Sequence, residues 1–490
     1  MSSLRQQNAA SLKSKTVKGG AITLSAQMAT ILIQLVSIVT LSRLLPPEDF
    51  GVIAMIMSVI AFMALFRDMG LSTASIQKGL LNHDQISLLF WLNVLAGLVL
   101  TLVVLALSPS VAWFYGRPEL QPICALLSVS FIITSIGAQH GAMMQRELRF
   151  KPKAIADVAG ALVNLAVAIL LAMRGAGYWS LAWGTVCGAL VTTLLYLMLG
   201  GFWPGRPRKA QGVREMLGFG ADVTAFEIVN YFSRNLDNIL LGRVWGASVL
   251  GMYSRAYQMM MLPINSLRTP INAVAFPVLS RLRDDPISFR RYYCRVASML
   301  AFLSMPLMAF LTVNAENVVV VSIGERWRQV TPIFVLLGVT GFIQPVASLR
   351  GMVLLSLGRS RRYLGWGVFN AIAVCISFTA GVPWGAEGIA LAYAISNYAI
   401  LYPSLIYSFH DSPLKLSDFF TTIAMPFFAS LVAATINFTM LRPLAPIGAL
   451  PGLAVAFITF IGTYLLCFVA IPRGRETLRS YVSLVHTLRR

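Results

Sequence analysis

Long apolar runs alternate with short polar connections along the whole chain. Each run is close to the ~20 residues that a membrane-spanning helix needs. We place about 14 spans, at residues 19–42, 48–67, 86–108, 120–144, 155–173, 177–200, 217–242, 249–279, 296–321, 330–356, 363–382, 386–408, 418–440 and 449–471. The pattern predicts an all-α polytopic membrane protein.

The same pattern repeats at a shift of 200 residues. The shift aligns Gly20-Ala21 with Gly220-Ala221, Leu41 with Leu241, Arg43 with Arg243 and Gly51 with Gly251. Polar positions align too: Gln27, Thr30, Gln34 and Ser37 correspond to Glu227, Asn230, Arg234 and Asp237. Because both copies begin on the same side of the membrane, we expect a parallel repeat of two six-helix lobes, followed by two extra C-terminal helices.

The repeat also predicts the domain boundaries. A cytoplasmic N-terminal segment covers residues 1–18, the first lobe 19–200, a basic linker rich in Pro and Gly 201–216, and the second lobe 217–409. Two further spans occupy residues 418–471, and a cytoplasmic tail covers 472–490.

Composition excludes an ordinary soluble domain, because 57% of the 490 residues are hydrophobic and only 12% are charged. With the N-terminus placed in the cytoplasm, 28 of the 39 Lys and Arg residues fall on the inside, seven on the outside and four within spans. Both termini are then cytoplasmic. We interpret the net charge of +20 as a topology signal with secondary contact to anionic membrane lipids, not as a nucleic-acid site. The first span carries no small-residue cleavage site and is interpreted as a signal anchor.

The seventh span carries a polar stripe in otherwise apolar sequence. Its four residues follow at steps of three, four and three, which places them on one helical face: Glu227, Asn230, Arg234 and Asp237. Charge within the hydrocarbon layer is costly, so the stripe should face a bundle interior or a wet cavity. The alternative is a structural ion pair between Arg234 and Asp237 that joins two helices.

Four arginines fall within spans: Arg234, Arg255, Arg268 and Arg350. Guanidinium groups bind phosphate bidentately and stay charged when buried, so a cavity holding several of them suits a diphosphate or another anionic ligand. For Arg268 and Arg350 the alternative is that they snorkel to a membrane surface. The side chains expected to contact sugars are Asn230, Tyr253 and Tyr257, with Gln27 and Gln34 from the first copy of the repeat.

Three acids in the same layer, Asp222, Glu227 and Asp237, are candidates for coupling ion movement to transport. A salt bridge with a cavity arginine explains them equally well. Asp157, near the start of the fifth span, is interpreted as an interfacial residue, and His140 as a hydrogen-bonded packing residue.

Motifs of catalytic chemistry are not found in the sequence. It contains no GxxxxGK(S/T) phosphate loop, no HExxH pair and no GxSxG elbow, and its five cysteines show no pairing or metal-binding pattern. We therefore expect neither a catalytic residue nor a metal or other cofactor, and interpret the protein as a transporter and not an enzyme.

Several segments together resemble a known family: SRLLPPEDFGVIAM, FRDMGLSTASIQK, NYFSRNLDNILLGRVWGASVLGMYSRAYQMMMLP, FPVLSRLRDD, GERWRQVTPIF and LGRSRR. The chain is similar to the Wzx-like polysaccharide exporters, of the colanic-acid and succinoglycan type, in the multidrug/oligosaccharidyl-lipid/polysaccharide flippase superfamily. The resemblance implies a bacterial inner-membrane protein with a MATE-like fold and alternating access. Its substrate would be an undecaprenyl-diphosphate-linked oligosaccharide, moved from the cytoplasmic to the periplasmic leaflet. It also suggests partnership with polysaccharide polymerase and export machinery.

Three alternatives remain at the level of sequence. A multidrug exporter of the same superfamily would favour an acidic cavity for organic cations, whereas this chain carries at least as many arginines as acids in that layer. A flippase for the peptidoglycan precursor would be essential for growth. A membrane polymerase or ligase of the polysaccharide would usually carry a sizeable periplasmic loop, and the predicted outside connections are short.

Overall fold

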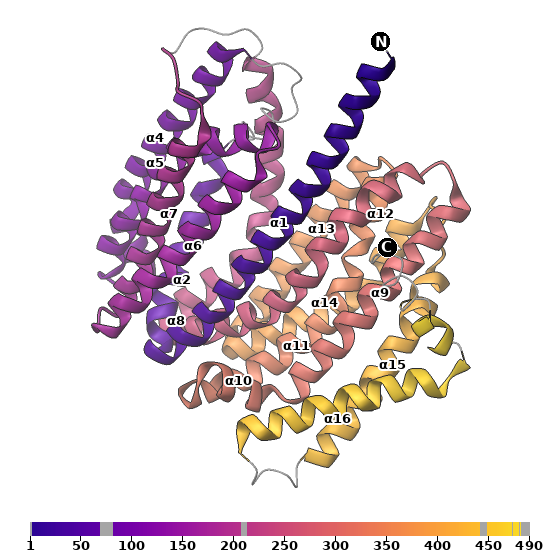
Figure 1. Ribbon diagram of the computed structural model, residues 1–490. Helices are drawn as coiled ribbons and strands as arrows, with labels where there is room; N and C mark the ends of the chain where they lie inside the picture. The colour runs from indigo at the N-terminus through magenta and orange to yellow at the C-terminus, as the bar shows by residue number, and fades with distance from the viewer. Residues whose placement is uncertain are drawn as a thin grey trace. The chain divides into compact units, whose positions relative to one another are not determined.

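The computed structural model describes residues 2–68, 82–206, 213–441, 448–472, 474–479 and 481, with side chains described except at 2–18, 21, 213–226, 229 and 440–441. Within these residues the regular structure is helical throughout (Figure 1). The predicted all-α class is confirmed.

The helices follow one another with short connections. Their bounds are α1 Ser2–Leu44, α2 Pro47–Asp68, α4 His83–Tyr115, α5 Leu120–Arg146, α6 Phe150–Met173, α7 Tyr178–Gly200, α8 Val213–Arg281, α9 Pro286–Val313, α10 Ala315–Ile323, α11 Thr331–Ala347, α12 Leu349–Ser356, α13 Ser360–Gly381, α14 Gly385–Phe409, α15 Leu416–Leu441 and α16 Ala449–Ala470. Short 3-10 turns, η1 Glu325–Val330 and η2 Val382–Trp384, precede α11 and α14.

By length and composition, 11 helical segments of the described chain could cross a membrane. One of them, Ser360–Phe409, contains both α13 and α14. Helix α8 is not among the 11. The polytopic architecture is therefore confirmed, while the number of about 14 spans stays a prediction.

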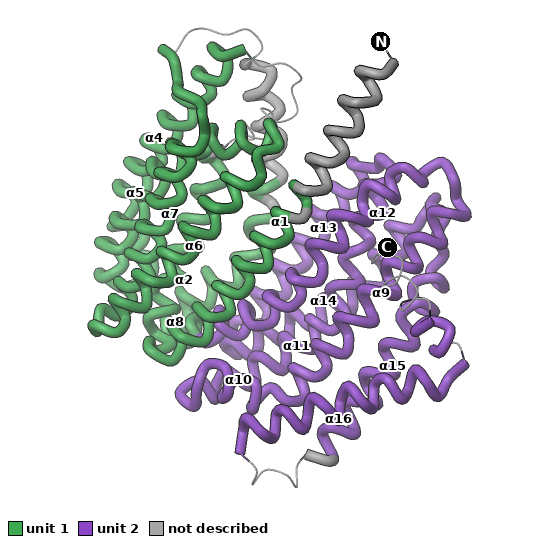
Figure 2. The backbone as a smooth tube through the Cα atoms, in the orientation of Figure 1, with its two compact units in different colours: residues 1–251 green, residues 252–490 purple. Residues whose placement is uncertain are grey.

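The chain folds into two compact units, Met1–Gly251 and Met252–Arg490 (Figure 2). The division lies within α8, just after Gly246, whose backbone (φ 80°, ψ −177°) interrupts the helix. A glycine tolerates this positive φ without steric cost. The interruption lies between the two spans predicted at 217–242 and 249–279. The lobe boundary at 201–216 rests on the sequence repeat and remains a prediction.

In the first unit, small residues let neighbouring helices approach closely. Between α6 and α7, a Cβ added to Gly188 would lie 2.8 Å from the Gly160 carbonyl oxygen. Such stripes of small residues favour helix association in a membrane, where dispersion contacts replace the hydrophobic effect. The chain leaving α7 is held by polar contacts: Arg149 donates to the Gly200 and Leu199 carbonyls, at 2.8 and 2.7 Å, and the buried His140 ring lies 3.1 Å from the Phe202 carbonyl oxygen. The packing role predicted for His140 is confirmed.

Two close backbone contacts in the first unit mirror each other. A Cβ on Gly51 would lie 1.7 Å from the Ala247 carbonyl oxygen, and one on Gly251 would lie 1.8 Å from the Pro47 carbonyl oxygen. Shifting the first pair by 200 residues and exchanging its members yields the second pair. This reciprocity agrees locally with the predicted register, although the complete repeat stays a prediction.

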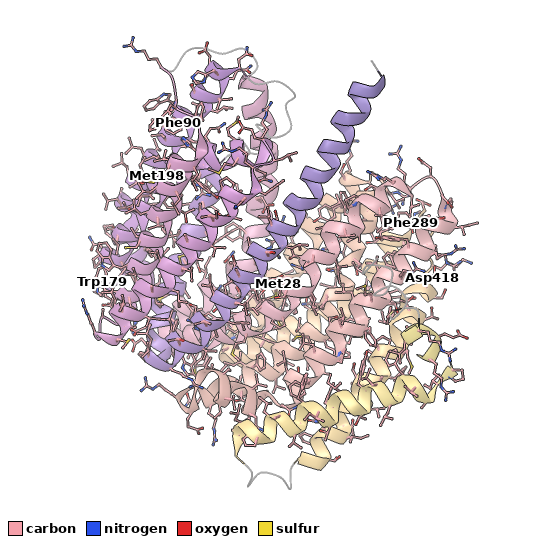
Figure 3. The ribbon with its side chains drawn as sticks, in the orientation of Figure 1. Met28, Phe90, Trp179, Met198, Phe289 and Asp418 are labelled. Atoms are coloured by element: carbon pink, nitrogen blue, oxygen red, sulfur yellow. The ribbon has the colours of Figure 1, made fainter. Side chains whose placement is uncertain are left out.

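The second unit contains the two last predicted spans. Helix α15 packs against α9 and α16, and its first turn carries Asp418 (Figure 3). Arg290 of α9 donates to both carboxylate oxygens of Asp418, at 2.8 and 2.5 Å. Farther along, Asn314 donates to Asn437 Oδ1 at 2.9 Å, and Asn437 donates to the Ala456 carbonyl at 2.8 Å. These bonds connect α9, α15, α16 and Asn314, the residue that follows α9; Asp418, Asn314 and Asn437 are buried.

Candidate functional site

The polar stripe of α8 shows graded exposure. Glu227 and Asn230 are half-buried, Arg234 is exposed, and Asp237 is buried with 2% of its surface accessible. Asp237 Oδ1 accepts the backbone N–H of Asn238 at 2.8 Å. The side chain of Asp222, the third acid predicted for ion coupling, lies outside the described residues. The stripe therefore combines an accessible cation with a buried carboxylate on one helix.

Tyr231 attaches this part of α8 to α2. Its buried hydroxyl donates a hydrogen bond to the Ser58 carbonyl, and its ring packs against Phe62 and Phe232, with centroids 5.1 and 5.3 Å away. Because Tyr231 adjoins Asn230 in sequence, the same contacts set the rotation of α8 and hence the direction of the stripe.

The second part of α8 buries an arginine among aromatic rings. Arg255 is 7% exposed, and its Nη1 donates to Gln258 Oε1 at 2.6 Å. Tyr253 is fully buried and stacks on Tyr257, with ring centroids 6.2 Å apart and an interplanar angle of 23°. A guanidinium stays protonated in such surroundings, so this position offers a positive charge of low hydration.

The other two predicted arginines are held by neutral oxygen acceptors. Arg268 Nη2 donates to Asn265 Oδ1 at 2.9 Å, and the half-buried Arg350 donates to Ser404 Oγ of α14 at 3.0 Å. Arg234 belongs to the first unit, whereas Arg255, Arg268 and Arg350 belong to the second.

In the first unit, Gln27 of α1 lines a polar cavity of about 280 Å³, together with Thr30, Lys153 and Asp157. Gln34, predicted with it, is exposed on the same helix. In the sequence, Lys153 counts only as one of the 28 Lys and Arg residues predicted on the inside, and Asp157 is interpreted as an interfacial residue. The signal that could have found them is the Lys-Asp pair at i, i+4 on one face of the fifth span.

Beside this cavity, two of its lining residues and Tyr196 form a closed set of hydrogen bonds. Lys153 Nζ donates to Asp157 Oδ2 at 2.8 Å and to the Tyr196 hydroxyl at 3.2 Å. The Tyr196 hydroxyl donates to Asp157 Oδ1 at 2.5 Å. Tyr196 comes from α7, so the set joins α6 and α7 beside α1.

A second cavity of the first unit, about 290 Å³ in volume, is almost entirely apolar. Helices α2, α4 and α8 line it with side chains that include Phe62, Leu107, Phe114 and Phe232. Such a lining suits a hydrocarbon chain better than a sugar or a phosphate.

Residues 40–332 match the sequence profile of a family described as polysaccharide biosynthesis protein. The chain belongs to this family. The match covers both parts of α8, with the polar stripe and Arg255, and it confirms the resemblance expected from the sequence segments.

Two proteins of polysaccharide biosynthesis align with most of the chain. The lipopolysaccharide biosynthesis protein WzxC of Escherichia coli (strain K12) is 27% identical over 440 residues, covering 88% of each chain. The teichuronic acid biosynthesis protein TuaB of Bacillus subtilis (strain 168) is 28% identical over 442 residues, covering 87% of this chain and 89% of TuaB.

Among solved structures, the lipid II flippase MurJ in an inward closed conformation has a similar fold. The TM-score is 0.76, the sequence identity is 14%, and the match covers 91% of this chain and 98% of MurJ. At this identity the likeness concerns the fold alone, a bundle of membrane-spanning helices.

Proposed function

We propose that the protein is a flippase that moves undecaprenyl-diphosphate-linked oligosaccharide repeat units from the cytoplasmic to the periplasmic leaflet for exopolysaccharide or lipopolysaccharide biosynthesis. The observation that carries the proposal is that a chain of the polysaccharide biosynthesis family has the fold of a lipid II flippase over 91% of its length. Polysaccharide repeat units and lipid II pose the same physical problem, because each joins a polar saccharide headgroup to a long lipid.

The diphosphate is the part of this substrate that is hardest to move through hydrocarbon, since removing an unpaired charge from water costs many kcal/mol. Guanidinium groups that bind the diphosphate would offset this free-energy cost. The main contacts are Arg234 and Arg255, and the further ones are Arg268 and Arg350. Arg255 supports the assignment because it is almost fully buried yet stays charged.

The remaining site residues complete the proposal. Asn230, Tyr253, Tyr257, Gln27 and Gln34 contact the sugars by hydrogen bonds and ring faces. Glu227, Asp237 and Asp222 take part in coupling to an ion. The buried carboxylate of Asp237 supports this role, because buried intramembrane acids commonly serve proton or ion movement.

The mechanism is alternating access: the two lobes rotate about the bound headgroup, so that the site opens first to the cytoplasm and then to the periplasm. The polyprenyl tail stays in the lipid throughout. The distribution of Lys and Arg supports cytoplasmic termini and a location in the bacterial inner membrane. A periplasmic polymerase and export machinery then receive the lipid-linked repeat unit. The protein itself performs no covalent chemistry.

The test is a strain that lacks the gene, in which lipid-linked oligosaccharide is assayed by leaflet beside secreted polysaccharide. We expect repeat units to accumulate in the inner leaflet and polymer to be lost. Repeat units that reach the periplasmic leaflet without being polymerised would instead indicate a polymerase. An unchanged lipid pool would favour a multidrug exporter, and loss of viability on depletion would favour a flippase for the peptidoglycan precursor.

A further inference from the structure

We propose that the polar cavity on α1, α5 and α6, here named the Lys153 pocket, binds a sugar ring of the lipid-linked oligosaccharide. The residues that carry the argument are Gln27, Thr30, Gln145, Phe150, Lys153 and Asp157. Figure 3 labels Met28, the residue that follows Gln27 on α1. The inference rests on the proposed function and assigns the saccharide part of that substrate to a defined place.

Charge balance in the pocket favours a neutral ligand. Lys153 and Asp157 are the charged residues among its described lining, and they neutralise each other across 2.8 Å. A diphosphate requires an excess of positive charge, which this pair does not supply. A coupling cation would compete for Asp157 with an ammonium group that the chain itself provides. The pocket is therefore polar but close to electroneutral.

Its hydrogen-bonding groups match sugar hydroxyls, each of which donates once and accepts up to twice. The Thr30 hydroxyl donates to the Ala26 carbonyl at 2.9 Å, so its oxygen is left to accept. Gln27 and Gln145 each offer a donor and an acceptor. Within the described residues, the bonds from Lys153 to Asp157 and Tyr196 use two of its three ammonium hydrogens, which leaves one for a ligand.

Shape and position agree with this ligand. The volume of about 280 Å³ lies just below the range of roughly 300–1,000 Å³ for small-molecule sites and suits one ring, while the polar lining does not suit a lipid chain. The Phe150 ring adds an apolar surface for the C–H face of a sugar. Lys153 and Asp157 are the fourth and eighth residues of α6, near the connection that is predicted to be cytoplasmic. A headgroup loaded from the cytoplasm would reach the pocket at the start of transport.

Tyr196 is a positioning residue in this scheme. Its hydroxyl bonds to Asp157 and Lys153 from α7, and so holds both charged groups in one geometry behind the pocket. Preorganisation of this kind lowers the cost of ordering long side chains when a ligand binds.

The experiment uses the full-length protein in lipid nanodiscs and two probes. One is the lipid-linked oligosaccharide extracted from the deletion strain, and the other is undecaprenyl diphosphate without sugar. For Asp157→Asn we expect affinity for the glycosylated lipid to fall about tenfold, as for the loss of one charge-assisted hydrogen bond, and for Gln27→Ala about threefold to tenfold, as for the loss of a neutral one. For undecaprenyl diphosphate the change should be less than twofold. Asp157→Asn keeps the shape of the pocket, and Gln27→Ala leaves the Lys153–Asp157 pair intact.

Matched lysine variants control for charge. Lys153→Met should reduce binding of the glycosylated lipid selectively, whereas Lys151→Met, at an exposed position two residues away, should bind both probes as the wild type does. Equal loss of both probes in the pocket variants, or no loss of either, would overturn the inference and leave the proposed function standing. Wild-type protein that binds neither probe would overturn the proposed function and this inference with it.

Discussion

At the scale of single residues, we propose that the buried guanidinium of Arg255 and the ion pair of the Lys153 pocket recognise different parts of the lipid-linked oligosaccharide. Arg255 is 7% exposed and carries a charge that can bind phosphate, whereas Lys153 and Asp157 cancel each other and leave hydrogen bonds. A positive charge stabilises an anion, and a neutral polar set stabilises hydroxyls. The two kinds of site are therefore expected to respond differently to substitution.

Arg255→Ala and Arg234→Ala should each reduce secreted polysaccharide by about tenfold or more, since a charge-assisted hydrogen bond contributes about 1.5–3 kcal/mol. Arg255→Lys should give an intermediate amount, because an ammonium keeps the charge but loses the bidentate geometry. The measurement is polymer yield normalised to the amount of protein in the membrane. Arg283→Ala, at a side chain that is 60% exposed, serves as the control. Near-normal polymer from both alanine variants would exclude the proposed roles.

At the scale of helices, close contacts and polar bridges decide the packing. Gly51 of α2 and Gly251 of α8 lie against backbone, so even a methyl group has no space there. Asn437 of α15 accepts a hydrogen bond from Asn314, the residue between α9 and α10, and donates to Ala456 and Thr459 of α16. Each feature yields a stability test that is independent of transport.

Gly51→Ala should destabilise the protein by about 1–3 kcal/mol, because the added Cβ would overlap the Ala247 carbonyl, although alanine favours helix over glycine. Gly20→Ala is the matched control, since no atom lies within 4 Å of its new Cβ. Thermal unfolding in detergent measures the difference. An unchanged midpoint for Gly51→Ala would show that α2 and α8 are not in close contact in the membrane.

Asn437→Ala should lower stability by about 1 kcal/mol, the range measured for hydrogen bonds between membrane helices. The exposed Thr439→Ala on the same helix should have little effect. The check is again the unfolding midpoint in detergent, measured beside polymer export, which should persist. A larger loss of export than of stability would instead place Asn437 on the transport path.

At the scale of the whole molecule, the open question is how often α8 crosses the membrane. Two crossings by α8 would place its interruption at Gly246 on the periplasmic side, whereas no crossing would place it in the cytoplasm. Accessibility from one side therefore distinguishes the two topologies.

In a background without native cysteines, Ser248→Cys should react with a membrane-impermeant maleimide added to spheroplasts. Ser360→Cys should react only after the membrane is permeabilised, because its connection is predicted to be cytoplasmic. Both serines are exposed in the structure, so access to the reagent depends on the side of the membrane. Protection of Ser248→Cys in spheroplasts would contradict the predicted topology.

The sequence alone was sufficient to determine the all-helical membrane architecture and the family. Spans can be recognised in a sequence because a segment that crosses the bilayer must be long and apolar and must form its backbone hydrogen bonds within itself. This constraint applies to each helix separately. The segments around Gly51 and from Asn230 to Pro263 were specific enough to indicate the polysaccharide exporters, and the family match over residues 40–332 confirmed them.

Only the tertiary structure brought Gln27, Asp157 and Tyr196 together, from α1, α6 and α7. It also determined that Tyr253 is fully buried while Arg234 is exposed. Both residues belong to predicted spans in which polar residues interrupt an apolar sequence. The physical reason is that a pocket depends on the rotation and spacing of helices far apart in the chain. The rotation and spacing of helices are set by packing between their side chains, and they cannot be predicted from hydropathy along the sequence.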